Sequence, residues 1–237
     1  MEIPSTHPRI KSLKLRQKLV DGLRDGIVDH AGLIAHGRGE AFDYLLGEKT
    51  TDEAQKAIKA AIYALQHAAN PVISVNGNSA ALTSKEIIEL SNILDAKIEV
   101  NLFHKSSERE KKIKQKLLDA GATKVYGVGV DASERIPALE SNRRKVDPRG
   151  IHASDAILVM LEDGDRTEAL TALGKKVLAI DLNPLSRTAQ KADISIVDNI
   201  SRALPELIKA AREKPKPTRY NNKKNLKQTI DKMRAGI

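Results

Sequence analysis

Residues 71–79, PVISVNGNS, place a short apolar strand directly before a polar loop. A helical pattern follows from Thr83, with Glu86 as its capping partner. This order is typical of open α/β sheets, which bind ligands beyond the carboxyl ends of their strands. A β-hairpin is the competing interpretation of the Asn76-Gly77 step, but the helical pattern that follows disfavours it.

Strand and helix patterns alternate along the rest of the chain. We predict strands at about 98–103, 124–130, 156–161, 176–180 and 194–197, and helices at about 9–26, 50–69, 108–120 and 201–212. The alternation predicts an α/β fold with a three-layer, mostly parallel, Rossmann-like sheet. The run GVGVDA at 127–132 has the form of a dinucleotide fingerprint, but Pro137 and polar residues follow where a helix should begin, which disfavours that motif.

The chain is predicted to be one domain with an appendage. Residues 1–213 form the domain, with a mainly helical part at 1–70 and an α/β core at 71–213, and residues 214–237 form a basic tail. The net charge is +9, and the tail holds eight basic residues and one acid, so the body carries only +2. A nearly neutral body predicts no nucleic-acid partner, and the tail is predicted to be a solvated or partner-docking segment.

Composition excludes several kinds of chemistry. The chain has no cysteine, which excludes disulfides, zinc-thiolate sites and thiol nucleophiles. No apolar run approaches the roughly 18 residues of a membrane span, and the N-terminal residues do not have a signal-peptide pattern. We therefore expect a cytoplasmic protein without a membrane partner. The sequence also has no P-loop and no metal-spaced histidine pair, so an enzyme built on it would act by positioning and charge neutralisation.

The stretch GLIAHGRGEAFDYLLGE, residues 32–48, combines three glycines with His36 and Arg38. We predict a Gly-Arg-Gly turn before a helix at 40–46, which would place amides and a guanidinium near a helix N-terminus. Such an arrangement holds a phosphate or a carboxylate. A glycine-rich turn with a solvated arginine is the alternative. Arg16, on the apolar face of the first helix, needs a fixed anion in either a ligand or a carboxylate elsewhere in the fold.

Polar residues also follow the later strands. Asp181-Leu182-Asn183 follows one strand and Asn199 follows the last, and an acid at a strand end often binds a ribose hydroxyl. Asp163 and Asp165 follow the strand at 156–161, where they suit either Mg²⁺ held with ligand phosphates or the dipole of a helix N-terminus. Residues 131–154 form a long loop with five cations, which is either a lid over phosphates or a solvated loop.

Six segments carry a family resemblance. They are IPSTHPRIKSLKLRQKLVDG at 3–22, GLIAHGRGEAFDYLLGE at 32–48, NPVISVNGNSAAL at 70–82, IEVNLF at 98–103, LEDGDRTEAL at 161–170 and IDLNPLSRTAQKADISIVDNI at 180–200. In these segments the chain resembles the archaeal-type phosphopantothenate synthetases, also called 4-phosphopantoate–β-alanine ligases. The resemblance covers residues 3–210 in order, and the tail has no motif that we can match to it.

The resemblance implies ATP-dependent amide formation in coenzyme A synthesis. ATP adenylates the carboxylate of 4-phosphopantoate with release of pyrophosphate, and the amine of β-alanine then displaces AMP. It also implies a homodimer, and phosphoryl chemistry of this kind calls for Mg²⁺. Two other classes stay open from the residues alone: another ATP- or NAD-using enzyme on the same sheet, and a nucleic-acid binder acting through the tail.

The resemblance places the ATP contacts on a defined set of residues: Arg16, Arg38, Asp181, Leu182, Asn183, Arg187, Thr188, Asn199 and Ile200. The loop geometry places Asn76, Gly77 and Asn78 near the phosphopantoate, with His36 beside them. We predict catalytic roles for Arg38 and His36. Replacing Arg38 by alanine is expected to lower turnover at least about tenfold, roughly 1.4 kcal/mol. The Mg²⁺ ligands are not determined, beyond an acid among Asp163, Asp165 and Asp181.

Overall fold

A computed structural model describes residues 4, 6–7, 9–217 and 219–235. At its centre is a five-stranded sheet in the order β2-β1-β5-β6-β7, and all four strand pairs are parallel. The strands are β1 (Pro71–Val75), β2 (Lys97–Val100), β5 (Ala156–Met160), β6 (Lys176–Ile180) and β7 (Ile194–Ile196). The predicted parallel α/β fold is confirmed.

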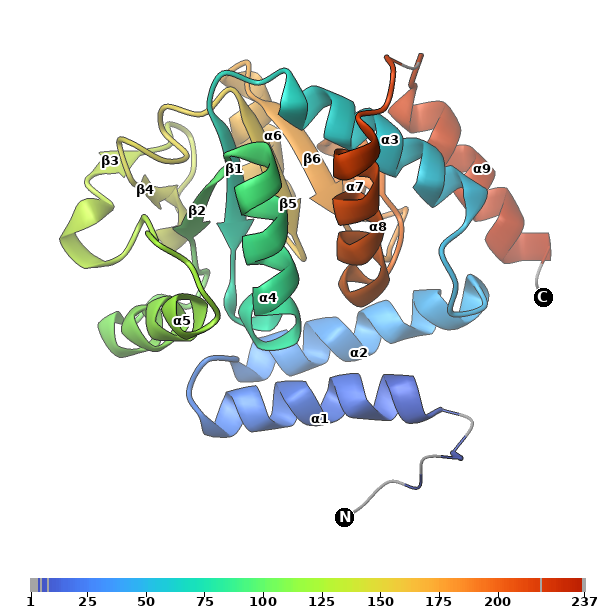
Figure 1. Ribbon diagram of the computed structural model, residues 1–237, viewed down its shortest axis with the longest axis horizontal. Coiled ribbons are helices and arrows are strands. Elements are labelled where there is room, and N and C mark those ends of the chain that lie inside the picture. Colours follow the sequence, from blue (N-terminus) through green and yellow to red (C-terminus); the bar gives the residue numbers. More distant parts are fainter. Residues whose placement is uncertain (1–3, 5, 8, 218, 236–237) are drawn as a thin grey trace.

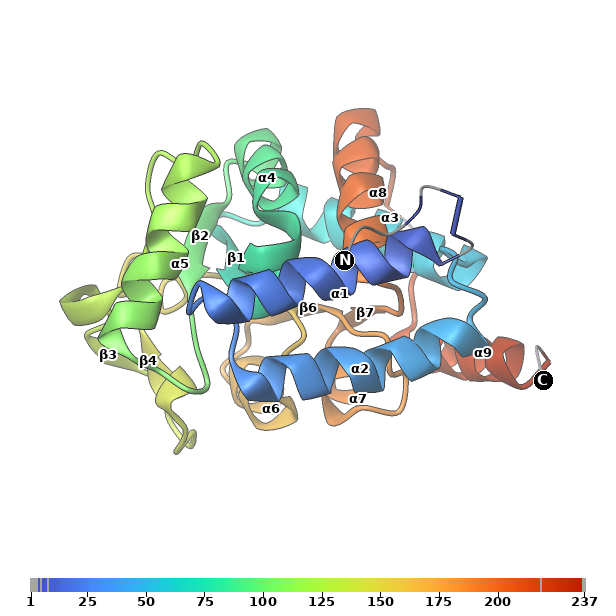
Figure 2. The same cartoon turned by 90° about the horizontal axis from the view of Figure 1, so that it is seen from below.

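Helices cover both faces of this sheet. On one face lie α3 (Asp52–Gln66), α4 (Gly77–Leu94), α5 (Ser107–Asp119) and α8 (Ile200–Glu213), and on the other lie α6 (Gly164–Ala172) and α7 (Arg187–Lys191) (Figures 1 and 2). Alternate strand residues point to opposite faces: Ile73 and Leu158 enter one core, whereas Val72 and Ile157 enter the other. The structure is therefore the three-layer arrangement that the sequence predicted.

Two N-terminal helices cross the end of the sheet. Helices α1 (Ile10–Arg24) and α2 (His30–Leu45) run side by side beneath the carboxyl ends of the strands (Figures 1 and 2). The predicted Gly-Arg-Gly turn is wrong, because Gly37 and Gly39 lie inside the continuous helix α2. Glycine instead allows close packing. A Cβ on Gly32 would stand 2.2 Å from Asn78 Oδ1, whereas one on Gly39 would make an ordinary van der Waals contact with Leu182 Cδ1 at 3.4 Å.

The segment between α5 and β5 is folded onto the sheet. The strand predicted at 124–130 is wrong, because only Tyr126 forms a bridge there, to Glu99 of β2. The short strands β3 (Glu134–Arg135) and β4 (Lys145–Val146) pair in an antiparallel way. Six apolar side chains of the segment are buried, namely Val125, Ala132, Ile136, Leu139, Val146 and Ile151. A solvated loop is thus contradicted, while a closing movement stays a prediction.

Buried Glu99 ties this segment to the sheet. Its carboxylate accepts hydrogen bonds from Asp147 N at 3.1 Å and from Ile151 N at 2.6 Å. A Cβ on Gly150 would stand 2.0 Å from Glu99 Oε2, so glycine is required for this approach. Burial raises the pKa of Glu99 to about 7, against the lowering effect of the two N–H donors.

The basic tail forms helix α9 (Asn222–Ala235), which packs against α3 and α7. Leu226 and Met233 are buried, and Asn225 Nδ2 donates to Glu53 O at 3.0 Å. The tail therefore docks on its own chain, in contrast to the predicted solvated segment. Residues 1–3, 5, 8, 218 and 236–237 of the predicted domain and tail lie outside the described residues. Within the described part, none of the helices has the length and hydropathy needed to cross a membrane.

Candidate active site

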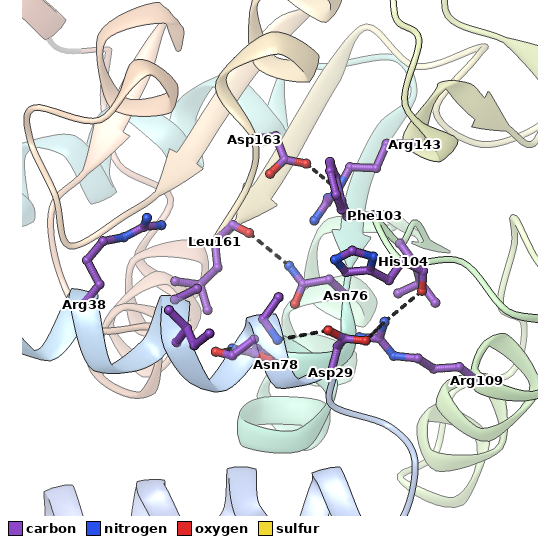
Figure 3. Close-up of a pocket in the computed structure, with 15 residues that line it drawn as sticks. Asp29, Arg38, Asn76, Asn78, Phe103, His104, Arg109, Arg143, Leu161 and Asp163 are labelled. Carbon is purple, nitrogen blue, oxygen red and sulfur yellow. Dashed lines mark hydrogen bonds and ion pairs between the residues drawn. The ribbon is translucent and has the colours of Figure 1, made fainter.

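Two cavities open at the carboxyl edge of the sheet. Helix α2 passes beneath the strand ends there (Figure 1), and Figure 3 shows the residues that line the first cavity. The β1/β5 cavity has a volume of about 350 Å³ and borders the ends of β1, β2 and β5. The β5/β6 cavity has a volume of about 480 Å³ and borders the ends of β5 and β6. Both are lined by Ala35, Arg38, Phe103, Leu161 and Asp163. They form one continuous cleft with Arg38 at the junction.

The β1/β5 cavity lies where the strand order reverses. From β1 the chain crosses to β2 on one side, and it later returns to β5 on the other. Asn76 spans the two strand ends, because its Nδ2 donates to Met160 O at 2.7 Å while its Oδ1 accepts from Ser79 N at 3.0 Å. Crevices at such a reversal are the usual ligand sites of open α/β sheets.

The polar stretch after β1 is not a loop, in contrast to the prediction. It forms the first turn of α4, capped by Asn76, and the predicted helix start at Thr83 is a kink inside that helix (φ −144°, ψ 32°). At Gly77 a Cβ would stand 2.2 Å from Ile27 O. Asn78 Nδ2 donates at 2.8 Å to a main-chain carbonyl of α2. The N-terminus of α4 thus borders the cavity, an arrangement that favours an anionic ligand.

A buried network of charges lies behind the junction. Arg143 forms ion pairs with Glu162 Oε1 at 2.5 Å and Asp163 Oδ2 at 2.8 Å. Arg166 is fully buried, pairs with Glu162 and donates to Ser74 Oγ at 3.2 Å. Burial raises the pKa of Asp163, although the charge of Arg143 opposes this shift. Arg143 thus pairs with two carboxylates, of which Glu162 is shared with Arg166.

Arg109, from the first turn of α5, stands at the far end of the β1/β5 cavity from Arg38 (Figure 3). Its Nε donates to Ile27 O at 2.8 Å, and its Nη1 donates to His104 O at 2.9 Å. Among the described residues its one carboxylate partner is Asp29, with Oδ2 at 3.8 Å from Nη1. Burial lowers the pKa of Arg109, which is the expected effect of removing a guanidinium from water.

The β5/β6 cavity is built around Asp181, which follows β6. Its carboxylate accepts from Asn183 N at 2.9 Å and from Ser186 Oγ at 2.6 Å. Burial raises the pKa of Asp181, while these bonds and the charge of Arg38 lower it. A carboxylate held in this way at a strand end can accept hydrogen bonds from ribose hydroxyls.

Two helix N-termini face the same cavity. Helix α6 begins at Gly164, beside Asp165, and helix α7 begins at Arg187. Thr188 Oγ1 donates to Glu162 O at 2.7 Å, which joins α7 to the end of β5. Arg187 pairs with Glu168 and, at 3.3 Å, with Asp165. Helix N-termini with an adjacent guanidinium suit the phosphates of a nucleotide.

The described residues contain no group of three or more acidic or histidine side chains arranged to hold a metal ion. Asp163 and Asp165 nevertheless line the β5/β6 cavity at the N-terminus of α6. Mg²⁺ in nucleotide sites is commonly held by one or two carboxylates together with phosphate oxygens. These two side chains fit that donor set.

Most of the predicted site residues meet in the cleft. It is lined by Arg38, Asn76, Asn78, Asp181, Leu182, Asn183, Arg187 and Thr188. Gly77 lies directly behind this lining, between Ile27 and Arg109. Residues predicted from one helix, one loop and two strand ends are thus brought to a single surface.

Four predicted residues line neither cavity: Arg16, His36, Asn199 and Ile200. Arg16 Nε bonds Glu40 Oε2 at 2.8 Å, so its anion is a carboxylate of the fold. His36 is buried beside the same group, with its Nε2 4.0 Å from Glu40 Oε1, and burial lowers its pKa. Asn199 caps α8 and faces Asp43 on the same side of α2. Within a single chain, His36 therefore does not line the cleft.

Three ionisable residues of the β1/β5 cavity had no place in the sequence-based prediction: Asp29, His104 and Arg109. His104 follows the end of β2, so the rule used for the other strand ends could have found it. Arg109 lies in a helix with many charges, SEREKKIKQKLLD, and no local pattern separates it from its neighbours. Only its long-range contacts with Ile27 and Gly77 identify it.

Comparisons with known proteins give consistent matches. A family model described as phosphopantothenate/pantothenate synthetase matches residues 53–236, which includes the tail. A 4-phosphopantoate–β-alanine ligase of Thermococcus onnurineus is 53% identical over 213 residues, 90% of this chain and 81% of that protein. The ligase of the same name from Thermococcus kodakarensis is 52% identical over the same shares of both chains. That of Methanosarcina mazei is 48% identical over 245 residues, 100% of this chain and 96% of that protein.

Proposed function

The chain belongs to the phosphopantothenate/pantothenate synthetase family, and on this premise we propose that it condenses 4-phosphopantoate with β-alanine. The product is 4'-phosphopantothenate, a precursor of coenzyme A. The observation that carries the proposal is the identity of about half of all aligned residues with ligases of that name. The two-part cleft supports it, because the reaction brings a nucleotide and a short anionic acid together.

The reaction has two steps. In the first, a carboxylate oxygen of 4-phosphopantoate attacks the α-phosphorus of ATP, a P–O bond breaks and pyrophosphate leaves. In the second, the amine nitrogen of β-alanine attacks the acyl carbon, the bond from that carbon to the AMP oxygen breaks, and the amine releases its proton. The nucleotide occupies the β5/β6 cavity, and the acid occupies the β1/β5 cavity. The reacting atoms meet at the junction.

Arg38 is the residue that serves both steps. It lines both cavities and carries no ion pair among the described residues. As pyrophosphate leaves, negative charge builds on the phosphate oxygens, and a positioned guanidinium stabilises that charge more than it stabilises the ground state. Asp181 and Asn183 orient the ribose, and the N-termini of α6 and α7 receive phosphates. Catalysis in this cleft is positioning and charge neutralisation.

Asp163 and Asp165 would hold Mg²⁺ together with phosphate oxygens of ATP. The ion would neutralise phosphate charge. Arg143 keeps Asp163 in place through their ion pair at 2.8 Å. Replacing Asp163 by asparagine tests this role, because it should raise the Mg²⁺ concentration needed for half-maximal rate. Denaturant unfolding of the variant measures separately what the loss of the ion pair with Arg143 costs in stability.

The experiment that tests the function measures nucleotides in purified protein incubated with Mg-ATP, 4-phosphopantoate and β-alanine, with each component omitted in turn. AMP and phosphopantothenate that form only in the complete mixture would support the ligase. ADP in place of AMP would contradict the adenylate step. The absence of any turnover would contradict the proposed activity.

We also propose that the enzyme is a cytoplasmic homodimer. Sedimentation velocity measures the mass in solution, and a single species with the mass of one chain would contradict the dimer. The competing function, nucleic-acid binding through the tail, predicts that replacing the exposed Lys223, Lys224 and Lys227 of α9 by alanine removes RNA binding and leaves ATP binding intact.

A further inference from the structure

The family description covers both phosphopantothenate and pantothenate synthetases, so the family alone does not say whether the acid substrate is phosphorylated. Resting on the proposed function, we infer that Arg109 recognises the phosphate of the acid and makes the enzyme selective for the phosphorylated form. Arg109 is a binding and specificity residue at the end of the cleft away from the nucleotide.

Besides Arg38, two arginines line the β1/β5 cavity, Arg109 and Arg143. The charge of Arg109 is the less neutralised of the two. Arg143 has ion pairs with two carboxylates at 2.5 and 2.8 Å. Among the described residues Arg109 pairs with Asp29 alone, through Oδ2 at 3.8 Å, which is beyond hydrogen-bond distance. The side chain of Arg109 is only 15% exposed. A cation that is shielded from water and weakly paired is a strong site for an anion.

The guanidinium is also fixed in place. Two main-chain carbonyls, of Ile27 and His104, accept from its Nε and Nη1. Its Nη2 occupies space that exists because residue 77 is glycine, since a Cβ there would stand 2.7 Å from this atom. Arg109 therefore loses little conformational entropy when a ligand binds, because contacts with residues 27, 77 and 104 already fix its position.

The shape of the cavity matches the anatomy of the phosphorylated acid. The carboxylate of 4-phosphopantoate must lie at the junction, beside Arg38, because it attacks ATP there. Its phosphate is at the other end of a four-carbon chain, and Arg109 lies across the cavity from Arg38 (Figure 3). The lining of this cavity includes the apolar side chains of Ile34, Leu102, Phe103 and Leu161, which suit the two methyl groups of the substrate. The amides of Asn76 and Asn78, which lie between the two arginines (Figure 3), can bond its hydroxyl group.

An acid without the phosphate would leave Arg109 without its partner. A site built to bond a polar group rejects an analogue that lacks it by up to about 10⁴-fold. We therefore expect wild-type protein to prefer 4-phosphopantoate over pantoate by about a thousandfold in kcat/KM, with most of the difference in KM. The preference follows from the cost of leaving a shielded cation unpaired.

The test compares 4-phosphopantoate with pantoate in steady-state kinetics of wild type, Arg109→Lys and Arg109→Met. In Arg109→Met we expect the KM for 4-phosphopantoate to rise about a hundredfold, while the KM for ATP and the slow rate with pantoate stay within about twofold. Arg109→Lys keeps the positive charge but loses the planar fork of N–H donors, so its KM for 4-phosphopantoate should lie between those of wild type and Arg109→Met. The matched control is Arg212→Met, an exposed arginine of α8 outside the cleft, which should behave as wild type.

Inorganic phosphate gives a second readout that a purely structural role would not change. It should compete with 4-phosphopantoate in wild type and lose that inhibition in Arg109→Met. An unchanged ratio between the two acids, or an equal loss with both, would overturn the inference. If wild type makes no AMP with either acid, the proposed function fails instead, so the two failures are distinguishable.

Discussion

The two halves of the cleft are built in different ways. In the β5/β6 cavity, the central carboxylate bonds to neighbours in the chain: Asp181 accepts from Asn183 N and Ser186 Oγ. In the β1/β5 cavity, the cations come from distant elements, and Arg109 is held by Ile27 O, 82 residues away. The first half follows directly from a strand and its turn. The second depends on how α2, α5 and the segment after it pack, so changes far from the cleft should affect it more.

The largest effect is expected from Glu99, which anchors the segment that carries Arg143. The folded pKa of about 7 lies above the ordinary value of 4.5, so between these pH values the folded state binds more protons than the unfolded state. This contribution to stability is therefore lost as pH rises from 4.5 through 7, and it is constant above. The expected fall in the free energy of unfolding is about 3 kcal/mol.

Denaturant unfolding of wild type and Glu99→Gln between pH 4.5 and 8 measures this effect. The variant cannot titrate at residue 99, so the difference between the two curves isolates Glu99 from Asp163 and Asp181, whose pKa values are also raised by burial. Parallel curves across the whole range would show that Glu99 stays charged in the folded protein.

Arg38 should affect both halves, because it lines both cavities. Arg38→Ala is expected to lower kcat/KM about a hundredfold, roughly 2.7 kcal/mol, with ATP and with 4-phosphopantoate alike. Steady-state kinetics with each substrate varied in turn gives the two values. A loss confined to one substrate would assign Arg38 to one cavity and contradict its place at the junction. Arg16→Ala is the contrast, since Arg16 pairs with Glu40 outside the cleft.

Asp181 should affect only the nucleotide half. Asp181→Asn keeps the size of the side chain and removes the charge that orients Ser186 and Asn183. We expect the KM for ATP to rise about tenfold and the KM for 4-phosphopantoate to stay unchanged, the reverse of Arg109→Met. Isothermal titration with a non-hydrolysable ATP analogue measures the same difference without turnover. Equal changes for both ligands would mean that the two cavities do not bind independently.

This contrast also explains what the sequence could predict. Strand ends such as Val75, Met160 and Ile180 have a local pattern, an apolar run followed by polar residues, so the parallel sheet and the residues after it were predictable. The helix α2 was not, because its glycines at 37 and 39 are signals for a turn when their packing partners are unknown. Tertiary packing overrides that local preference: Phe42 of α2 packs in the same apolar cluster as Leu226 and Met233 of the tail helix α9.

The smallest predicted effect concerns the glycines of α2. It tests directly whether packing outweighs their local preference for a turn. A Cβ on Gly37 would have no heavy atom within 4 Å, whereas one on Gly32 would stand 2.2 Å from Asn78 Oδ1. Because alanine is favoured over glycine in a helix interior by about 1 kcal/mol, Gly37→Ala should raise the free energy of unfolding by about that amount. Gly32→Ala should lower it and raise the KM for 4-phosphopantoate, since Asn78 borders the β1/β5 cavity. Thermal and denaturant unfolding measure both. A destabilised Gly37→Ala would mean that residues 37–39 form the turn predicted from the sequence, because alanine is unfavourable only where a glycine takes positive φ.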